Sequence, residues 1–269
     1  MIKRILNKLN IYKTYKIKVR NTFFKVPIFN KLGFANLNLA EPWMQDVLLK
    51  LGNESTNFLD VGVNVGQTLM RIKAEYPNVN YVGIEPNTDC VFYVNKLISE
   101  NNIINSVVLP IALGNVTQLN YLYISQTDPS DSSATTIKDF RQNENRKALP
   151  IITFPFDLLK DTNFDLIKID VEGSELEIID SIFSKGNCSS IFICEVLPVY
   201  NQDNQVRLDR QNKIESILKE NDYNIFRITK GNKVGVELIS TIGIHSDMEQ
   251  CDYLFVPISK SEDTKKKFA

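Results

Sequence analysis

The sequence predicts an α/β fold in which a doubly wound, mostly parallel sheet carries helices on both faces. Between residues 57 and 110, short apolar runs alternate with helical segments in the order strand, helix, strand, helix, strand. The runs at 57–61, 81–85 and 106–110 have the length and composition of buried strands. Apolar residues at helical spacing mark 68–76 and 88–100 between them. This alternation is typical of a parallel sheet whose crossovers are helices.

Residues 1–52 are expected to form a helical extension in front of a single domain that spans 53–269. Residues 41–52 place five apolar side chains at helical spacing before Gly52: Trp43, Met44, Val47, Leu48 and Leu51. Residues 1–20 alternate basic with apolar side chains, which suits an amphipathic helix. Such a helix lies either on an acidic membrane surface or with one face on the domain and the other in solvent. The segment lacks the continuous apolar stretch of a signal peptide or a membrane span.

Beyond residue 110 the strand and helix pattern continues less regularly. A further strand is expected near 119–124, and the polar stretch 125–150 is either a substrate-binding lid or a mobile surface insertion. Buried strands follow at 164–169 and 191–196, and Ser174 and Glu177 have capping-box spacing for the helix between them. A helix near 209–221, strands near 224–228 and 253–257, and a frayed lysine-rich tail complete the prediction.

The composition is that of an ordinary globular protein. Hydrophobic residues make up 43% and charged residues 23% of the 269-residue chain. The net charge of −1 gives no support to a nucleic-acid-binding field. The four cysteines include no Cys-x-x-Cys pair, which favours reduced thiols in a cytoplasmic protein over a zinc site or a disulfide framework.

The turn after the first strand, in FLDVGVNVGQT at 58–68, discriminates between three classes of ligand. A triphosphate loop needs two glycines five residues apart and then a lysine, but Gly62 and Gly66 are closer and Gln67 follows. A dinucleotide turn has a glycine where Asn64 stands, and the carboxylate of Asp60 would repel a pyrophosphate. A phosphate-free cofactor with a positive charge, such as S-adenosylmethionine, fits best.

Glu85 ends the second strand, where a carboxylate can accept hydrogen bonds from both hydroxyls of a ribose. Dinucleotide enzymes use such an acid as well, so Asp60 and Glu85 together carry the interpretation. The alternative is structural: Asp60 caps the following helix and Glu85 is a solvated strand end.

With these motifs the chain resembles the FkbM family of S-adenosylmethionine-dependent methyltransferases, which have a Rossmann-like class I methyltransferase fold. The similar segments are EPWM, FLDVGVNVGQ, VGIEPN, IALGN, FDLIKIDVEGSELEII and IFICEV, in this order over most of 41–196. Beyond residue 197 the similarity is weaker. Val63 departs from the family, which more often has alanine at that position.

The resemblance implies a role for each matching residue. The methionine end of the cofactor would be lined by Asp60, Gly62, Val63, Asn64 and Gly66. The ribose and adenine would be bound by Glu85, Pro86, Asn87, Ala112 and Leu113. Asp170 would face the neighbourhood of the transferred methyl group.

Methyl transfer to a hydroxyl requires alignment of the acceptor and removal of its proton. Asp170, Glu172 and Glu195 end neighbouring strands, so one of them could act as the base, or all three could bind a divalent ion such as Mg²⁺. The alternative is that Glu172 and Glu195 only hold the crevice in shape. His245, the single histidine, is either a base or a surface residue.

Polar residues of 125–150 could bind a polyhydroxylated acceptor, although any solvated loop contains them: Ser132, Ser133 and Thr135. We therefore expect an O-methyltransferase that acts on a sugar, a glycan precursor or a secondary metabolite. Two alternatives stay open. One is a nucleotide-sugar dehydrogenase or epimerase that uses NAD, and the other is a catalytically silent module of a glycan-assembly complex.

Overall fold

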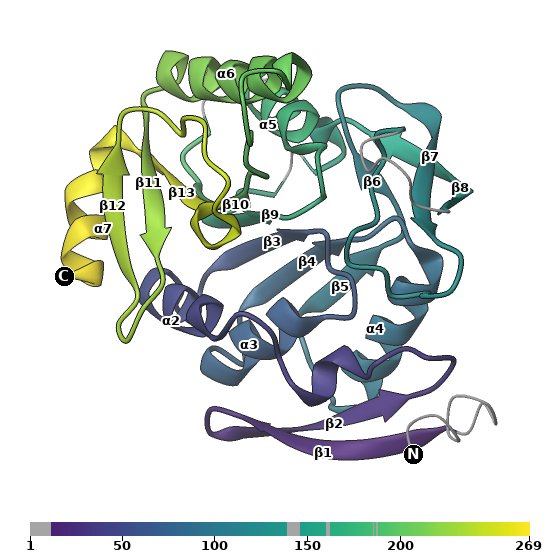
Figure 1. Ribbon diagram of the computed structural model, residues 1–269. Helices are drawn as coiled ribbons and strands as arrows, with labels where there is room; N and C mark the ends of the chain where they lie inside the picture. Colours follow the sequence, from purple (N-terminus) through teal and green to yellow (C-terminus); the bar gives the residue numbers. More distant parts are fainter. Residues whose placement is uncertain (1–11, 139–145, 160–161, 185, 187) are drawn as a thin grey trace.

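The computed structural model describes residues 12–138, 146–159, 162–184, 186 and 188–269 (Figure 1). Its centre is an eight-stranded sheet in the order β12-β11-β13-β10-β9-β3-β4-β5. The strands span β3 Asn57–Val61, β4 Asn80–Ile84, β5 Ser106–Leu109, β9 Leu166–Ile169, β10 Ile191–Glu195, β11 Tyr223–Thr229, β12 Gly235–Ile239 and β13 Asp252–Pro257. Strands β10, β9, β3, β4 and β5 pair in parallel, whereas β13 runs antiparallel to both of its neighbours. The predicted doubly wound, mostly parallel sheet is confirmed.

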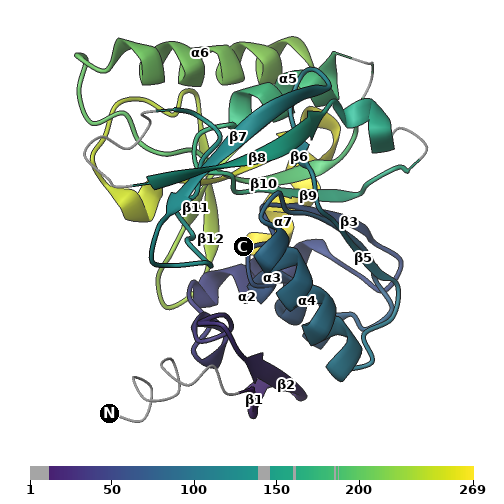
Figure 2. The same cartoon turned by 90° about the vertical axis from the view of Figure 1, so that its right-hand side faces the viewer.

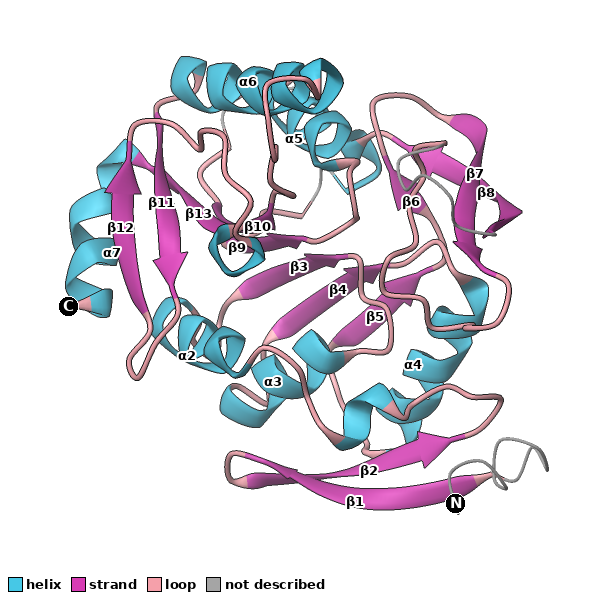
Figure 3. Ribbon diagram, in the orientation of Figure 1, coloured by secondary structure: helices cyan, strands magenta, loops and turns pink. Residues whose placement is uncertain are grey.

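Helices cover both faces of the sheet (Figure 3). They span α2 Pro42–Leu51, α3 Gln67–Glu75, α4 Thr88–Glu100, α5 Glu175–Phe183, α6 Gln205–Glu220 and α7 Ser261–Phe268. One core packs α2, α3, α4 and α7 on the sheet, and a second packs α5 and α6 on the opposite face. Because side chains alternate along a strand, Phe58 enters the first core and Leu59 the second.

A three-stranded sheet flanks the central one at the end of β5. Its order is β6-β8-β7, with β6 Ala112–Leu113, β7 Gln118–Ser125 and β8 Arg146–Phe154. β7 confirms the strand expected near 119–124. β8 was not expected, because its first residues belong to the polar stretch 125–150. Figure 2 shows this small sheet in front of the ends of the central strands.

The N-terminal segment differs from the expected helical extension. Residues 1–11 lie outside the described residues, and Lys13–Val19 (β1) and Thr22–Ile28 (β2) form an antiparallel hairpin instead of an amphipathic helix. The alternation of Lys16, Ile17, Lys18 and Val19 has period two, which is the strand period. The helix expected in 41–52 is present as α2. The division into an extension and a domain at residue 53 stays a prediction.

Two other expectations about local structure were wrong. The lysine-rich tail is not frayed, because it forms α7 and buries Phe268 in the core. Ser174 does not cap α5 with its side chain, and Glu177 pairs with Arg210 of α6 instead. Among the described residues, no helix is both long and apolar enough to cross a membrane.

Candidate functional site

The turn between β3 and α3 contains two glycines in the left-handed region, with φ of +92° at Gly62 and +78° at Gly66. A Cβ on Gly62 would lie 1.9 Å from the carbonyl oxygen of Asp170, at the end of β9. Glycine is therefore required where two parallel strand ends meet. Gly66 begins α3 as its N-cap. At Gly62 the close approach is to the chain's own backbone, and an approach of this turn to a ligand stays a prediction.

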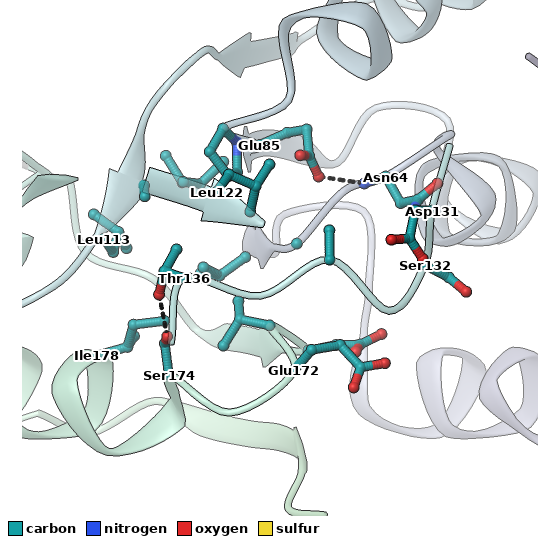
Figure 4. A pocket seen from close by; sticks show the side chains of 18 residues that line it. Asn64, Glu85, Leu113, Leu122, Asp131, Ser132, Thr136, Glu172, Ser174 and Ile178 are labelled. Carbon is teal, nitrogen blue, oxygen red and sulfur yellow. Dashed lines mark hydrogen bonds between the residues drawn. The ribbon is translucent and has the colours of Figure 1, made fainter. Parts of the chain in front are cut away.

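A cavity lies beside this turn, at the carboxyl ends of β3, β4 and β9 (Figure 4). Its empty volume is about 680 Å³ with its open mouth included. The residues that line it are Val61, Gly62, Asn64, Ile84, Glu85, Pro86, Ala112, Leu113, Leu122, Asp131, Ser132, Ala134, Thr136, Asp170, Val171, Glu172, Ser174 and Ile178.

Carboxylates and apolar side chains dominate the lining. The acids are Glu85, Asp131, Asp170 and Glu172. The apolar wall includes Ile84, Ala112, Leu113, Leu122 and Ile178. No lysine, arginine or histidine occurs among the described lining residues. A lining of this kind favours a ligand that has a positive group and a flat apolar ring, and it offers no lining cation to pair with a diphosphate.

Glu85 is held at the wall of the cavity by backbone amides from two turns. Its Oε2 accepts a hydrogen bond from the Asn64 amide at 2.7 Å, and its Oε1 accepts one from the Asn87 amide at 2.8 Å. Burial raises the pKa of Glu85 to about 7, although both amides lower it. Each carboxylate oxygen retains a free lone pair. Glu85 therefore has acceptor capacity for two further hydrogen bonds, and its predicted role in binding a ribose stays a prediction.

Asp60 lies under the cavity and is not one of the lining residues. Its side chain is fully buried, its Oδ2 accepts a hydrogen bond from Tyr81 Oη at 2.6 Å, and its Oδ1 lies 3.7 Å from Lys168 Nζ. The pKa of Asp60 is raised overall, because the effect of burial exceeds that of the attraction to Lys168, which lowers it. Direct contact between Asp60 and a cofactor stays a prediction. The buried position of Asp60 does not support it.

Lys168 joins Asp60 to Asp170, which does line the cavity. Its Nζ lies 3.0 Å from Asp170 Oδ2, and the Asp170 side chain is 35% exposed. Burial lowers the pKa of Lys168, but attraction to Asp170 and Asp60 outweighs burial and raises it. Sequence reasoning did not select Lys168. The available signal was a lysine within the apolar strand LIKI, because a buried charge needs a partner.

Glu172 and Glu195, the other two acids expected at this edge, have different surroundings. Glu172 lines the cavity and has a left-handed backbone, with φ +57°. Glu195 does not line the cavity, and Cys251 Sγ donates to its Oε1 at 3.3 Å. Burial, then repulsion from Asp170 and Asp252, raises the pKa of Glu195 to about 9. Within the described residues, no three acidic, histidine or cysteine side chains are arranged to hold a metal ion.

Glu41 is a further carboxylate at this edge that sequence reasoning did not select. It precedes Pro42 as the N-cap of α2 and has a left-handed backbone, with φ +53°. Partial burial raises the pKa of Glu41, and repulsion from Asp170 and Asp252 raises it further. The segment EPWM therefore brings one more acid close to Asp170.

His245 lies outside the cavity lining. Its Nε2 is 3.2 Å from Tyr253 Oη, and its amide donates to the carbonyl of Val199. Burial, followed by repulsion from Arg227, lowers the pKa of His245. The arrangement connects the loop before β13 to the loop after β10. A catalytic role for His245 stays a prediction without support from this geometry.

The remaining residues proposed for the cofactor fall into two groups. Pro86, Ala112 and Leu113 line the cavity. Val63, Gly66 and Asn87 do not. Val63 is buried in the core, and Asn87 caps α4 by accepting the Asp89 amide at 3.1 Å. These two residues support the turns without reaching the cavity.

Residues 126–138 of the polar stretch, between β7 and the start of the undescribed residues, lie along one side of the cavity. Asn64 Nδ2 donates to the carbonyl of Ser130 at 3.2 Å, and Thr136 Oγ1 lies 2.5 Å from Ser174 Oγ. Ser132 lines the cavity, whereas Ser133 Oγ bonds Asp131 and the buried Thr135 bridges to β7. Residues 139–145 lie outside the described residues. Whether 125–150 binds a substrate stays a prediction, and residues 126–138 contact the turns that shape the cavity.

The chain is similar in fold to several solved methyltransferases. A putative S-adenosylmethionine-dependent methyltransferase from Streptococcus mutans matches 90% of this chain and 54% of its own, with 8% identity and a TM-score of 0.50. The FkbM methyltransferase of Methylobacillus flagellatus KT has 18% identity over 76% of this chain and 44% of its own, with a TM-score of 0.45. An O-methyltransferase from Bacillus cereus, in complex with SAH, has 13% identity over 82% and 85%, with a TM-score of 0.47. At these identities the similarity concerns the fold alone.

One curated relative matches part of the chain. The bifunctional methyltransferase of Rickettsia conorii is 30% identical over 145 residues, which are 51% of this chain and 26% of that protein. The chain thus covers about a quarter of this relative. The family model of the methyltransferase FkbM domain matches residues 60–225, which is more than half of the chain and includes the turn, Glu85, Lys168 and Asp170. The chain therefore belongs to the FkbM methyltransferase family.

Proposed function

We propose that this protein transfers the methyl group of S-adenosylmethionine to a hydroxyl of a sugar, a glycan precursor or a secondary metabolite in the cytoplasm. The supporting observation is the cavity lining, with four carboxylates, an apolar wall and no basic side chain among its described residues. S-adenosylmethionine carries an ammonium and a sulfonium but no phosphate. NAD would bring a diphosphate into a cavity whose described lining has no cationic side chain to pair with it.

The lining residues divide the cavity into a polar and an apolar part. Glu85 accepts the ribose hydroxyls with the lone pairs that its two amide bonds leave free. Ala112, Leu113 and Leu122 provide the apolar wall for adenine. Asp170 and Glu172 face the positively charged end of the donor from the turn after β9. This assignment uses only residues that line the cavity.

Asp170 is the carboxylate best placed to take the proton of the acceptor hydroxyl. S-adenosylmethionine supplies a methyl carbon that is already activated by its sulfonium. The acceptor oxygen forms the new C–O bond as the C–S bond breaks, and its proton passes to Asp170. Glu195 is not assigned this role, because it does not line the cavity and burial raises its pKa to about 9. The proposal uses a carboxylate base and assigns no step to a metal ion.

Turnover on a panel of hydroxyl acceptors tests this function. Purified protein, S-adenosylmethionine and one acceptor at a time should yield S-adenosylhomocysteine and a product heavier by one CH₂, in equal amounts. Asp170→Asn should abolish product formation while S-adenosylhomocysteine still binds. Asp209→Asn, a matched change on the exposed surface of α6, should have no effect.

Two results would contradict the proposal. Binding of S-adenosylhomocysteine without turnover on any acceptor would favour the catalytically silent module. Reduction of NAD in the presence of a nucleotide sugar would favour the dehydrogenase.

A further inference from the structure

We propose that the outer face of the hairpin β1–β2 binds the protein to a lipid surface with anionic headgroups. The hairpin lies on the outside of the molecule, below α3 and α4, at the end opposite α6 (Figure 1). This inference is independent of the proposed methyl transfer, because no residue of the hairpin lines the cavity.

The two faces of the hairpin differ in chemistry. The inner face is apolar and packs against Met70 of α3 and Leu97 of α4, with the buried side chains Val19, Phe24, Val26 and Ile28. The pairing Lys16↔Lys25 and Lys18↔Phe23 places these four residues on the opposite face, where all four are exposed. We call this set, Lys16, Lys18, Phe23 and Lys25, the lysine face.

The charge of the hairpin is strongly one-sided. Residues 13–28 contain five basic and no acidic residues, in a chain whose net charge is −1. Lys16 and Lys25 are direct cross-strand neighbours, an arrangement in which like charges destabilise a hairpin. In the described part of the chain, no carboxylate forms an ion pair with a lysine of this face. An anionic surface would relieve this repulsion, and cytoplasmic leaflets supply one.

Phe23 gives the lysine face an apolar centre. It is 56% exposed, and Lys16 Nζ and Lys18 Nζ lie 4.2 Å and 5.9 Å from its ring centroid. An exposed aromatic ring surrounded by lysines matches the boundary of a bilayer, where the ring enters the headgroup layer and the ammonium groups contact phosphates.

The same chemistry favours a lipid surface over a nucleic acid. Nucleic-acid sites rely on arginine for stacking and bidentate contacts. The only arginine of the hairpin, Arg20, lies in the turn between the strands and pairs with Glu75 at 2.9 Å. The lysine face therefore offers point charges and one ring, which suit a fluid array of headgroups.

Flotation of the full chain with vesicles tests the proposal. Vesicles of phosphatidylcholine with about one phosphatidylglycerol in three lipids should carry the protein, and pure phosphatidylcholine vesicles should not. The triple variant Lys16→Gln, Lys18→Gln, Lys25→Gln should lose about fivefold in affinity for each lysine. Phe23→Ser should weaken binding severalfold, and this loss should persist at high salt, which screens the lysines alone.

A matched control separates the lysine face from overall charge. The triple variant Lys213→Gln, Lys219→Gln, Lys266→Gln removes the same charge from exposed positions of α6 and α7 and should bind vesicles like the unmodified protein. Both triple variants should have a melting temperature no lower than that of the unmodified protein and should keep its affinity for S-adenosylhomocysteine. Absence of vesicle binding, equal losses in both triple variants, or tighter binding to single-stranded RNA than to anionic vesicles would each overturn the proposal.

Discussion

Lys168 Nζ lies 3.0 Å from Asp170 Oδ2 and 3.7 Å from Asp60 Oδ1, so one buried ammonium holds carboxylates at the ends of two neighbouring strands. The parallel register places Asp60 of β3 directly beside Lys168 of β9. Only Asp170 lines the cavity. The motifs DVGVNVG and IKID therefore form one ion-paired unit. In this unit Lys168 connects the buried Asp60 to Asp170 at the cavity wall.

Lys168→Met should lower the free energy of unfolding by about 3 to 5 kcal/mol, because it leaves the buried carboxylate of Asp60 without its cation. Adding Asp60→Asn to this variant should restore part of the loss, since the uncompensated charge is then removed. Urea unfolding of the two single variants and the double variant measures this coupling. Additive losses, with no recovery in the double variant, would show that the two side chains do not form a unit.

Glu85 should make stability and cofactor binding depend on pH in opposite directions. Its pKa rises from 4.5 to about 7 on folding. A raised pKa means that the folded protein binds the proton more tightly, so this contribution to stability is complete below pH 4.5 and lost as pH rises through about 7. The loss amounts to about 3 kcal/mol. Urea unfolding at several pH values should show this slope, and Glu85→Gln should reduce it.

S-adenosylhomocysteine affinity should instead rise between about pH 6 and pH 8, because ribose hydroxyls donate to the ionised form of Glu85. Calorimetric titrations across this range measure the effect. Glu85→Gln should bind weakly at every pH. An affinity of the unmodified protein that does not change with pH would contradict the role assigned to Glu85.

Gly62→Ala should disrupt the turn, whereas Gly243→Ala should be tolerated. Both glycines have positive φ, +92° and +75°, so both variants pay the backbone cost of about 1 kcal/mol. A Cβ at Gly62 would also collide with Asp170 O at 1.9 Å, but a Cβ at Gly243 would meet nothing within 4 Å. Gly62→Ala should therefore lose several kcal/mol more and abolish S-adenosylhomocysteine binding. Thermal unfolding and calorimetry would contradict this account if the two variants behaved alike.

Arg146→Met should weaken cofactor binding about tenfold by releasing the 126–138 segment. Arg146 Nη1 donates to Asp131 Oδ2 at 2.9 Å and to the carbonyl of Ser133 at 3.0 Å, which fixes Asp131 at the cavity. Lys147→Met changes the neighbouring, exposed residue of the same strand and should leave the affinity unchanged. The account would be wrong about this segment if both variants bound S-adenosylhomocysteine equally well.

The central sheet and most of the cavity could be predicted from the sequence, for a physical reason. Parallel strands buried on both faces appear as continuous apolar runs, and their carboxyl ends meet at one edge. Gly62, Glu85 and Asp170 follow such runs directly and do line the cavity. Position along the strand was therefore enough to group these residues.

The orientation of individual side chains could not be predicted in this way. Asp60 lies near the end of its strand, as Glu85 does. Its side chain, however, is on the same face of the sheet as Phe58 and is buried in the core, where it lies beside Lys168. This pairing depends on the register of two strands that are distant in sequence. The hairpin β1–β2 was missed because its period-two pattern is short and its basic residues also suit an amphipathic helix.

Calorimetric titration of the purified protein with S-adenosylhomocysteine and, separately, with NAD tests the central claim most directly. The cavity has four carboxylates and no described basic side chain in its lining, so saturable binding of S-adenosylhomocysteine and no heat from NAD are expected. Saturable binding of NAD without binding of S-adenosylhomocysteine would contradict the account.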